Sequence, residues 1–349
     1  MGVAGIQNAG VCLLMETISP GYRLWVAVSF SFGWITGLII LPGLAWIIRD
    51  WQYLEAVSTC GWLPMLIAWW FLPESPRWLL TRKRYADAEN TIRKFLSVNK
   101  LSVSNLDHTM KILEAKIEAE KKTNSTLTVL DLFKTPRLRR RTIEITFVFF
   151  VASFLYYGLT FDSARLGGSM YINLLISAAV ELPVCAVVPL VVKFVKRKPP
   201  IIVSFLIASI ACVLVIAVPE DMVVTKISLT MIGKMFISTA SGIKFVYGAE
   251  VFPTVIRTVG VGTAILCSRI GGAIAPFVRE LSKSTHVAVP SVTYGVLSIV
   301  AAIMVFLLPE TFNRQLPDTI LEIENPEKLA KYQTEGTIEE NELQEPVTA

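Results

Sequence analysis

Nine long apolar stretches constrain the fold of this chain more than any other feature of its sequence. About 20 apolar residues can cross the hydrocarbon core of a bilayer as an α-helix, which satisfies its own backbone hydrogen bonds. The chain is 53% hydrophobic and 17% charged, whereas soluble proteins carry about 25% charged residues. We predict an all-α, polytopic membrane protein with spans at about residues 2–18, 25–48, 51–71, 143–162, 170–192, 200–218, 227–248, 257–278 and 288–308.

A motif occurs twice in the chain, about 235 positions apart. Each copy has a Glu, a Pro and an Arg in that order within eight residues, and a Leu-Pro-Glu sequence further along the chain. The second Glu follows the first by 58 residues in one copy and by 60 in the other. The copies are Glu16, Pro20, Arg23 with Leu72-Pro73-Glu74-Ser75, and Glu250, Pro253, Arg257 with Leu308-Pro309-Glu310-Thr311. Internal repeats of membrane helices are typical of secondary transporters.

Basic residues indicate how the chain crosses the membrane, because cytoplasmic loops carry an excess of Lys and Arg. Segment 72–142 holds 16 Lys or Arg against 8 Asp or Glu, and the connection 193–198 is also basic. We place both in the cytosol, so that nine spans put the N-terminus outside. Residues 85–97 and 107–122 have the pattern of amphipathic helices. The expected organisation is a partial N-terminal bundle at 1–71, a basic cytoplasmic linker with short helices at 72–142, a six-helix C-terminal bundle at 143–309 and an acidic cytoplasmic tail at 310–349.

The rest of the composition gives no indication of an enzyme, a cofactor or a metal. All five cysteines fall inside apolar stretches, and His108 and His286 stand alone, which is neither a disulfide framework nor the spacing of a zinc site. We find no glycine-rich phosphate loop and no nucleophile–base arrangement. The net charge of +5 is modest and lies in loops, where it sets topology. We therefore expect no catalysis, no cofactor, no metal and no nucleic-acid partner.

Three segments carry a resemblance to a known family. They are Leu72-Pro73-Glu74-Ser75-Pro76-Arg77-Trp78-Leu79-Leu80, Gly248-Ala249-Glu250-Val251-Phe252-Pro253-Thr254-Val255-Ile256-Arg257, and Leu308-Pro309-Glu310-Thr311 followed by Leu316-Pro317-Asp318-Thr319. In them the chain resembles the major facilitator superfamily and, more narrowly, the organic cation, anion and zwitterion transporter family. The resemblance extends over about residues 1–320.

The resemblance implies a twelve-helix carrier of which this chain corresponds to helices four to twelve. The first three helices, and the large extracellular loop after the first, would be absent. We therefore expect an N-terminally truncated major facilitator-type bundle of about nine transmembrane helices. A shortened isoform, an alternative start and an incomplete gene model would each produce it.

The duplicated Glu and Arg residues are candidates for a cytoplasmic gate. The resemblance implies that they join in a network that closes the inward side of the carrier. Ion pairs that form in only one state set the balance between two states. A static anchor at the helix ends is the alternative. The predicted gating residues are Glu16, Arg23, Glu74, Arg77, Lys196, Arg197, Glu250 and Arg257.

Charged residues inside the spans are candidates for a substrate site, because a charge at bilayer depth is costly and usually faces a cavity or a partner. Glu181 and Arg269 lie near the centres of their spans, and Lys244 lies towards the cytoplasmic end of another. The resemblance places Arg269 where organic cation members carry Asp and where anion and zwitterion members carry Arg. A buried guanidinium there could hold a substrate carboxylate, and an internal ion pair with Glu181 is the alternative. Lys244 either adds positive charge to the site or extends towards the cytoplasm.

Aromatic residues complete the predicted substrate site. By resemblance, Tyr156 and Tyr157 match a pair that lines the substrate cavity, and Phe245 is similar. Aromatic faces suit flat or quaternary ammonium substrates, and ordinary packing or an interface belt is the alternative. The predicted substrate-binding residues are Tyr156, Tyr157, Glu181, Lys244, Phe245 and Arg269.

The sequence therefore predicts a secondary transporter of organic ions, anions or zwitterions more than cations, that works by alternating access in the plasma membrane. Its expected partners are a small organic ion and the lipid bilayer. The alternative is a truncated isoform that does not transport, and that misfolds or modulates the full-length carrier by associating with it. Uptake by this same chain distinguishes the two hypotheses.

Overall fold

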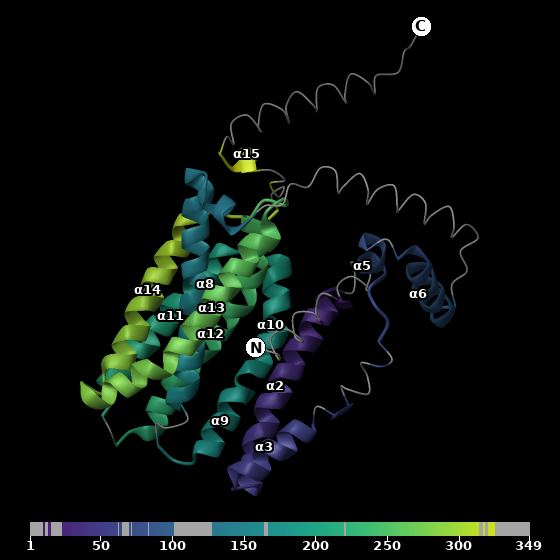
Figure 1. The fold of residues 1–349 in the computed structure, drawn as a ribbon. Coiled ribbons are helices and arrows are strands. Elements are labelled where there is room, and N and C mark those ends of the chain that lie inside the picture. The colour runs from purple at the N-terminus through teal and green to yellow at the C-terminus, as the bar shows by residue number, and fades with distance from the viewer. Residues whose placement is uncertain are drawn as a thin grey trace. The chain divides into compact units, whose positions relative to one another are not determined.

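The chain forms two compact units, Met1–Thr126 and Leu127–Ala349, and each is described by itself. Figure 1 shows that the described elements are helical in both units. The computed structural model describes residues 10, 13–14, 23–61, 63–64, 70, 72–82, 84–100, 128–163, 167–219, 221–313, 317 and 320–324.

The first unit contains four described helices of six residues or more. They are α2 (Arg23–Ile47), α3 (Trp51–Cys60), α5 (Pro76–Thr81) and α6 (Tyr85–Val98). Helix α2 agrees with the expected span 25–48, α3 with the first half of the next span, and α6 with the first amphipathic helix of the linker, whereas α5 was not predicted as a separate segment. Most of the expected span 2–18 and the whole of the second amphipathic helix, 107–122, lie outside the described residues.

The first unit also shows why the Pro-Glu-Ser-Pro-Arg sequence starts a helix. Ser75 is the N-cap of α5, and its hydroxyl accepts a hydrogen bond from the backbone N–H of Trp78 at 3.3 Å. Pro76 occupies the first helical position, where its missing N–H costs no hydrogen bond. The motif therefore has a local structural role besides any role in gating.

The second unit is a bundle of long helices. In chain order it contains η2 (Val129–Phe133), α8 (Pro136–Ser163), α9 (Met170–Ala179), α10 (Glu181–Phe194), α11 (Lys198–Ala217), α12 (Val223–Val251), α13 (Arg257–Ser284), α14 (Val289–Leu307) and α15 (Ile320–Glu324). Among the described residues, six segments are long and apolar enough to cross a membrane, with α9 and α10 counted as one. These six match the last six of the nine predicted spans. The total of nine is a prediction that the described residues do not test.

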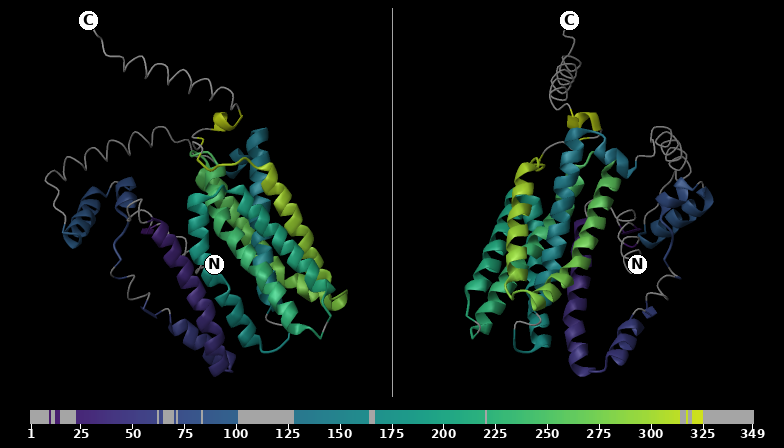
Figure 2. Two further views of the ribbon diagram at one scale, coloured as in Figure 1. Left: turned by 180° about the vertical axis from the view of Figure 1, so that it is seen from behind. Right: turned by 60° about the vertical axis from the view of Figure 1, so that its left-hand side comes forward.

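Helix α8 lies at the centre of this unit, where it contacts α12, α13 and α14 (Figure 2). Its buried side chains include Leu138, Ile145, Phe149, Ala152 and Leu155, all with 0% of their surface exposed. On the other side of the unit α11 packs against α12 and α14, and α10 packs against α12. The apolar core therefore runs along the whole length of α8.

Glycines allow α13 to approach α8 closely. A Cβ atom at Gly271 would lie 2.4 Å from the carbonyl oxygen of Phe150, and one at Gly272 would lie 2.7 Å from the ring of Tyr157. The hydroxyls of Ser153 and Ser268 also form a hydrogen bond between the two helices. Small residues permit such close contacts between membrane helices.

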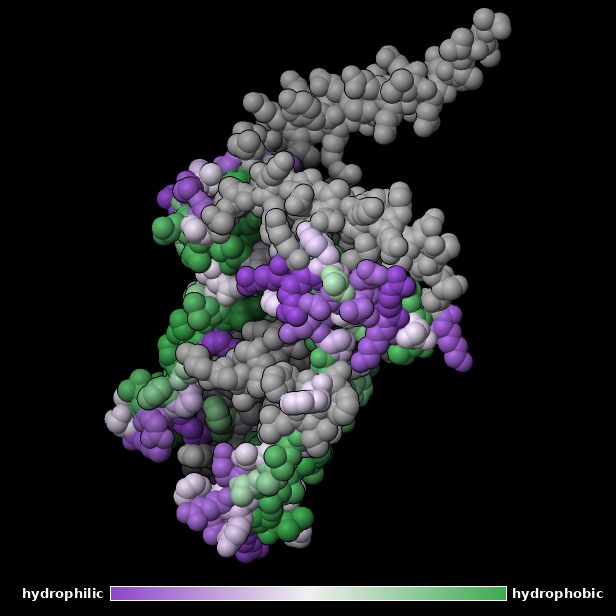
Figure 3. All heavy atoms as spheres, turned by 45° about the vertical axis from the view of Figure 1, so that its right-hand side comes forward, coloured by the Kyte–Doolittle hydropathy of each residue, from purple (hydrophilic) through white to green (hydrophobic). Residues whose placement is uncertain are grey.

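Large apolar side chains cover much of the outer surface. Leu266 and Phe277 on α13 and Val213 on α11 are each more than half exposed, and Figure 3 shows patches of hydrophobic residues on the visible face. Soluble monomers rarely expose such extended apolar surface. The second unit therefore has the surface of an integral multi-pass membrane protein.

The short helix α15 belongs to the expected acidic tail, and it is held against the start of α8. The side chain of Glu324 accepts hydrogen bonds from the backbone N–H groups of Arg137, at 2.8 Å, and Leu138, at 3.3 Å. Ile323 is 3% exposed and joins the core. Residues 320–324 of the tail therefore hold the N-terminus of the central helix.

Candidate functional site

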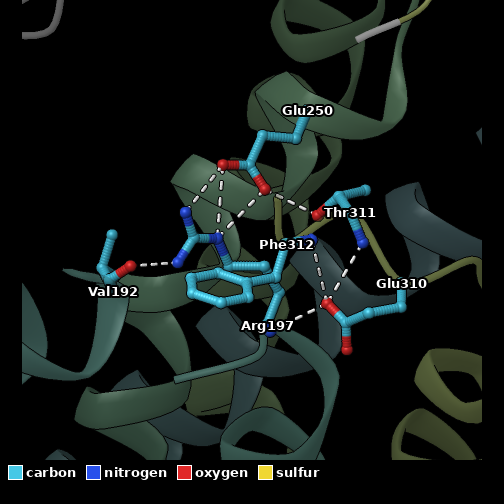
Figure 4. A network of polar contacts seen from close by, with 6 residues as sticks. All are labelled: Val192, Arg197, Glu250, Glu310, Thr311 and Phe312. Atoms are coloured by element: carbon cyan, nitrogen blue, oxygen red, sulfur yellow. Dashed lines mark hydrogen bonds and ion pairs between the residues drawn. The ribbon is translucent and has the colours of Figure 1, made fainter. Parts of the chain in front are cut away.

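An arginine–carboxylate pair joins α12 to the connection between α10 and α11. The Arg197 guanidinium donates from Nη2 to Oε1 of Glu250 and from Nε to Oε2, both at 3.0 Å. Figure 4 shows this two-pronged contact, together with a hydrogen bond from Arg197 to the carbonyl oxygen of Val192. The two charged side chains are only 12% and 17% exposed. Paired contacts of this kind are among the strongest side-chain hydrogen bonds.

Glu310 binds the N-terminus of α11 beside this pair. Its carboxylate accepts hydrogen bonds from the backbone N–H groups of Arg197 at 2.9 Å and Lys198 at 3.3 Å. Pro199 and Pro200 follow and have no N–H, so Glu310 bonds the last two donors before them. Partial burial raises the pKa of the Glu310 carboxyl, but its backbone N–H donors lower it more, and the resulting pKa lies below the ordinary value of 4.5. A negative charge at a helix N-terminus is favourable.

The residues after Glu310 complete this cluster. The Thr311 hydroxyl donates to Oε2 of Glu250 at 2.6 Å, and the Arg197 guanidinium lies 5.2 Å from the centre of the Phe312 ring (Figure 4). The Tyr247 hydroxyl donates to the carbonyl oxygen of Pro309 at 2.7 Å. Both halves of the second motif copy therefore meet at one end of the bundle. We call Arg197, Glu250, Glu310, Thr311 and Phe312 the motif cluster.

Two of the predicted gating residues in this unit lie outside the motif cluster. Arg257 bonds the Phe252 carbonyl at 3.4 Å and the Thr254 hydroxyl at 3.2 Å, and no ion pair joins it to Glu250 within the described residues. The reason is that α12 ends at Val251 and α13 begins at Arg257. The seven-residue spacing therefore does not place the two charges on one continuous helix. Lys196 is exposed beside Arg197.

The other gating residues belong to the first unit. Glu74 is exposed, just before α5. Glu16 lies outside the described residues, as do the side chains of Arg23 and Arg77. A network that includes these four residues stays a prediction.

A second charged cluster is buried inside the membrane-spanning part. Nζ of Lys234 lies 2.9 Å from Oε1 of Glu181, and the two side chains are 1% and 7% exposed. The Tyr156 hydroxyl donates to both carboxylate oxygens of Glu181, at 2.9 and 3.1 Å. Lys234 also donates to the carbonyl oxygen of Ser177 at 3.2 Å and bonds its hydroxyl. These contacts join α8, α9, α10 and α12.

This cluster corrects the alternative in which Glu181 pairs with Arg269. Glu181 is paired with Lys234, a second charge within an apolar stretch that was not among the predicted site residues. Arg269 is exposed on α13, so its guanidinium is not buried as expected. No hydrogen bond or ion pair joins it to another residue in the described part of the chain.

The remaining predicted substrate residues lie on α8 and α12. Lys244 is 2% exposed, and its Nζ lies 5.2 and 5.4 Å from the ring centres of Phe149 and Phe245. This burial is contrary to a lysine that extends to the cytoplasmic surface. Phe245 itself is 48% exposed. Tyr156 and Tyr157 have rings 5.3 Å apart at an interplanar angle of 88°.

A third ion pair, at the opposite end of the bundle, was also not predicted. Nη1 of Arg279 on α13 lies 2.6 Å from Oδ1 of Asp162 on α8. Both residues stand near the ends of apolar stretches, where charges are usually read as markers of the membrane surface. Within the described part of the chain, no group of three His, Cys, Asp or Glu residues is placed to hold a metal ion.

Comparison with known proteins gives one family. The family model described as "Sugar (and other) transporter" matches residues 2–319. The organic cation transporter protein of Drosophila melanogaster is 34% identical over 355 residues, which cover 98% of this chain and 64% of that protein. Solute carrier family 22 member 13 of Homo sapiens is 37% identical over 323 residues, which cover 92% and 57%. The chain thus spans about three fifths of the length of these curated relatives.

Solved structures with the same fold agree with this result. The major facilitator superfamily proton:xylose symporter XylE, bound to 6-bromo-6-deoxy-D-glucose, superimposes with a TM-score of 0.63 at 19% identity, covering 88% of this chain and 68% of that one. Identity this low shows the fold alone. The predicted all-α, major facilitator-type fold is confirmed.

Proposed function

We propose that this chain, which belongs to the sugar (and other) transporter family, is a secondary transporter that moves small organic ions by alternating access. Its relatives confirm the predicted membership among organic ion carriers of the major facilitator superfamily, and their family is one of transporters rather than enzymes. It is an integral multi-pass membrane protein, and we place it in the plasma membrane. The transport activity of the whole carrier, its organic ion substrate and its place in the plasma membrane are all proposed here.

The observation that carries the proposal is the buried charged cluster of Glu181, Lys234 and Tyr156. A buried ion pair is weak evidence of stability, because apolar residues of similar size often stabilise a protein as much or more. Within membrane spans, such charges mark substrate and ion pathways. The cluster thus supports a polar site in the membrane-spanning part of the bundle.

Excess positive charge supports organic anions or zwitterions as substrates. Lys234 neutralises Glu181, whereas Lys244 and Arg269 have no carboxylate partner in the described part of the chain. Lys244 instead lies beside two aromatic rings that contact each other. A substrate carboxylate would supply the missing negative charge, and the rings of Tyr156, Tyr157 and Phe245 would contact the organic part of the substrate.

Uptake measured with the Arg269→Asp variant tests this proposal. We expect uptake of a carboxylate such as p-aminohippurate to fall at least tenfold, because a charge-assisted hydrogen bond contributes about 1.5–3 kcal/mol. Uptake of a permanent cation such as tetraethylammonium should not fall, and Arg269→Lys should keep part of the carboxylate uptake. Equal loss of both substrates would reject a role in substrate charge selection.

The same assay with the unsubstituted chain tests transport itself. Saturable uptake would support a carrier. No uptake, with normal delivery to the cell surface, would instead support the non-transporting truncated form. Co-expression with a complete relative would then show whether the two chains associate.

A further inference from the structure

A cavity of about 330 Å³ opens at the end of the helical bundle opposite the motif cluster. Residues of α8, α11, α12, α13 and α14 line it, and none of them is a predicted substrate residue. Small-molecule sites begin at about 300 Å³. The cavity is thus large enough for a small organic molecule, and it is distinct from the buried charged cluster.

The polar groups around the cavity are mostly hydrogen-bond donors. Asp162 supplies the one carboxylate among the described lining residues, and Arg279 neutralises it at 2.6 Å. Lys226, half-buried in the first turn of α12, has no carboxylate partner in the described part of the chain. Nδ1 of His286 accepts a hydrogen bond from the N–H of Ala288 at 3.1 Å, so the other ring nitrogen is the one that can donate. The cavity therefore favours a ligand that carries negative charge and accepts hydrogen bonds.

A buried hydroxyl in the cavity wall is available to bond a ligand. Tyr294 lines the cavity and is 1% exposed. Its hydroxyl lies near Asp162 but has no partner in hydrogen-bond geometry among the described residues. Gly158 admits the phenol, because a Cβ atom there would lie 2.6 Å from the Tyr294 oxygen. Buried polar groups are nearly always hydrogen-bonded, so an unbonded one calls for an explanation.

The rest of the lining is apolar. Leu159, Val215, Ile216 and Leu229 supply hydrocarbon side chains from three helices. A site of this kind, with a few polar groups on an apolar wall, suits an amphiphilic molecule. An inorganic anion would leave the apolar part of the cavity unfilled.

We propose that this cavity binds a small amphiphilic carboxylate. Its carboxylate lies among Lys226, Arg279 and the Tyr294 hydroxyl, and its short hydrocarbon chain lies against the apolar wall. The site is separate from the transport site, since it lies within one bundle and shares no residue with Tyr156, Glu181 or Arg269. Under the predicted topology it faces the outside of the cell.

Protection of a cysteine against alkylation tests the proposal in the purified, detergent-solubilised chain. The cysteine replaces Ser291, which lines the cavity, and mass spectrometry of the peptide that contains it measures its rate of reaction with a maleimide. Hexanoate should slow this reaction in a saturable way. Hexylammonium and hexanamide, of the same length, should not slow it. No protection by hexanoate, or equal protection by hexylammonium, would overturn the proposal.

Variants then identify the charge that holds the carboxylate. Lys226→Met should raise the hexanoate concentration for half-protection about tenfold or more, because it removes a charge-assisted hydrogen bond. Lys226→Arg should restore most of the effect. Lys283→Met is the matched control, because Lys283 is exposed on α13 and paired with Glu280 at 2.7 Å outside the cavity. An unchanged half-protecting concentration in Lys226→Met would contradict the proposal.

The Arg269→Gln variant separates this site from transport. Half-protection by hexanoate should be unchanged in it, whatever happens to uptake. If this variant abolished protection, hexanoate would be bound at the transport site and the separate site would be rejected. Conversely, a chain that transports nothing should still show protection.

Discussion

An arginine–carboxylate pair at one end of the helical bundle and another at the opposite end lie in different surroundings. At one end Arg197 and Glu250 are 3.0 Å apart, with side chains 12% and 17% exposed. At the other end Arg279 and Asp162 are 2.6 Å apart, with side chains 27% and 16% exposed. The first pair is bonded to the chain segment after α14, whereas the second borders a cavity.

The neighbours of an ion pair, rather than the pair itself, decide what the pair can do. In the motif cluster the hydroxyl of Thr311 and the ring of Phe312 hold the pair, so breaking it would release the segment after α14. Beside the cavity, the donors next to Asp162 have room for a ligand. The first end is therefore suited to stabilise one of two conformations of the bundle. The second end is suited to bind a molecule.

The largest effect is expected from Glu250→Gln. This change leaves the mostly buried Arg197 guanidinium without its counter-charge. Removal of one partner of a buried pair lowers the free energy of unfolding by about 3 kcal/mol. Thermal unfolding of the purified chain in detergent should occur several degrees lower. If the motif cluster is also the gate, a reporter cysteine on the cytoplasmic side should become more accessible while substrate binding persists.

Glu280→Gln is the matched control for this prediction. Glu280 pairs with Lys283 at 2.7 Å, but both side chains are about 60% exposed, so its loss should change stability by less than about 1 kcal/mol. Equal effects of the two variants would show that the motif cluster is not held by its buried pair. Unchanged reporter accessibility in Glu250→Gln would count against the gate.

A smaller effect is expected from Asp162→Asn at the other end. This change removes the charge that neutralises Arg279, but Arg279 is more exposed than Arg197. We expect a loss of about 1–2 kcal/mol, between the values of surface and buried pairs. The added positive charge should at the same time tighten hexanoate protection in the cysteine assay. A loss larger than that of Glu250→Gln would reverse the comparison of the two ends.

Much of the fold could be predicted from the sequence because the bilayer sets the length of a span. All six long helices of the second unit coincide with predicted spans. The main difference is at α8, which begins at Pro136 rather than near residue 143. Arg137, Arg139, Arg140 and Arg141 continue the helix beyond its apolar part, so a search for apolar residues misses this extension.

The partners of the charged residues could not be predicted in the same way. Glu181 was recognised as a buried charge, but its partner is Lys234 and not Arg269. Which residue a charge meets depends on the rotation of each helix against its neighbours, and helices that are apolar on all sides carry little sequence signal for it. The contact between Arg197 and Glu250 was more accessible to sequence reasoning, because the duplicated motif marked one of its members.

The smallest effect is expected from Glu310→Gln, and it depends on pH. The pKa of Glu310 is lowered in the folded chain, so its charged form stabilises the fold above the unfolded value of about 4.5. This contribution is lost as the pH falls through the lowered folded pKa. At pH 7 the variant should lose about 0.5–1 kcal/mol, the usual contribution of a charge at a helix N-terminus.

Thermal unfolding between pH 3 and pH 7 measures this difference. The gap between the unsubstituted chain and Glu310→Gln should close as the medium is acidified below pH 4.5, whereas Glu280→Gln should show little gap at any pH. The Glu310 carboxylate accepts from backbone N–H groups at the N-terminus of α11. The Glu250 carboxylate accepts from the side chain of Arg197. If the gap stayed constant with pH, the charge of Glu310 would have no part in holding the motif cluster, and the loss would come from the change of side chain alone.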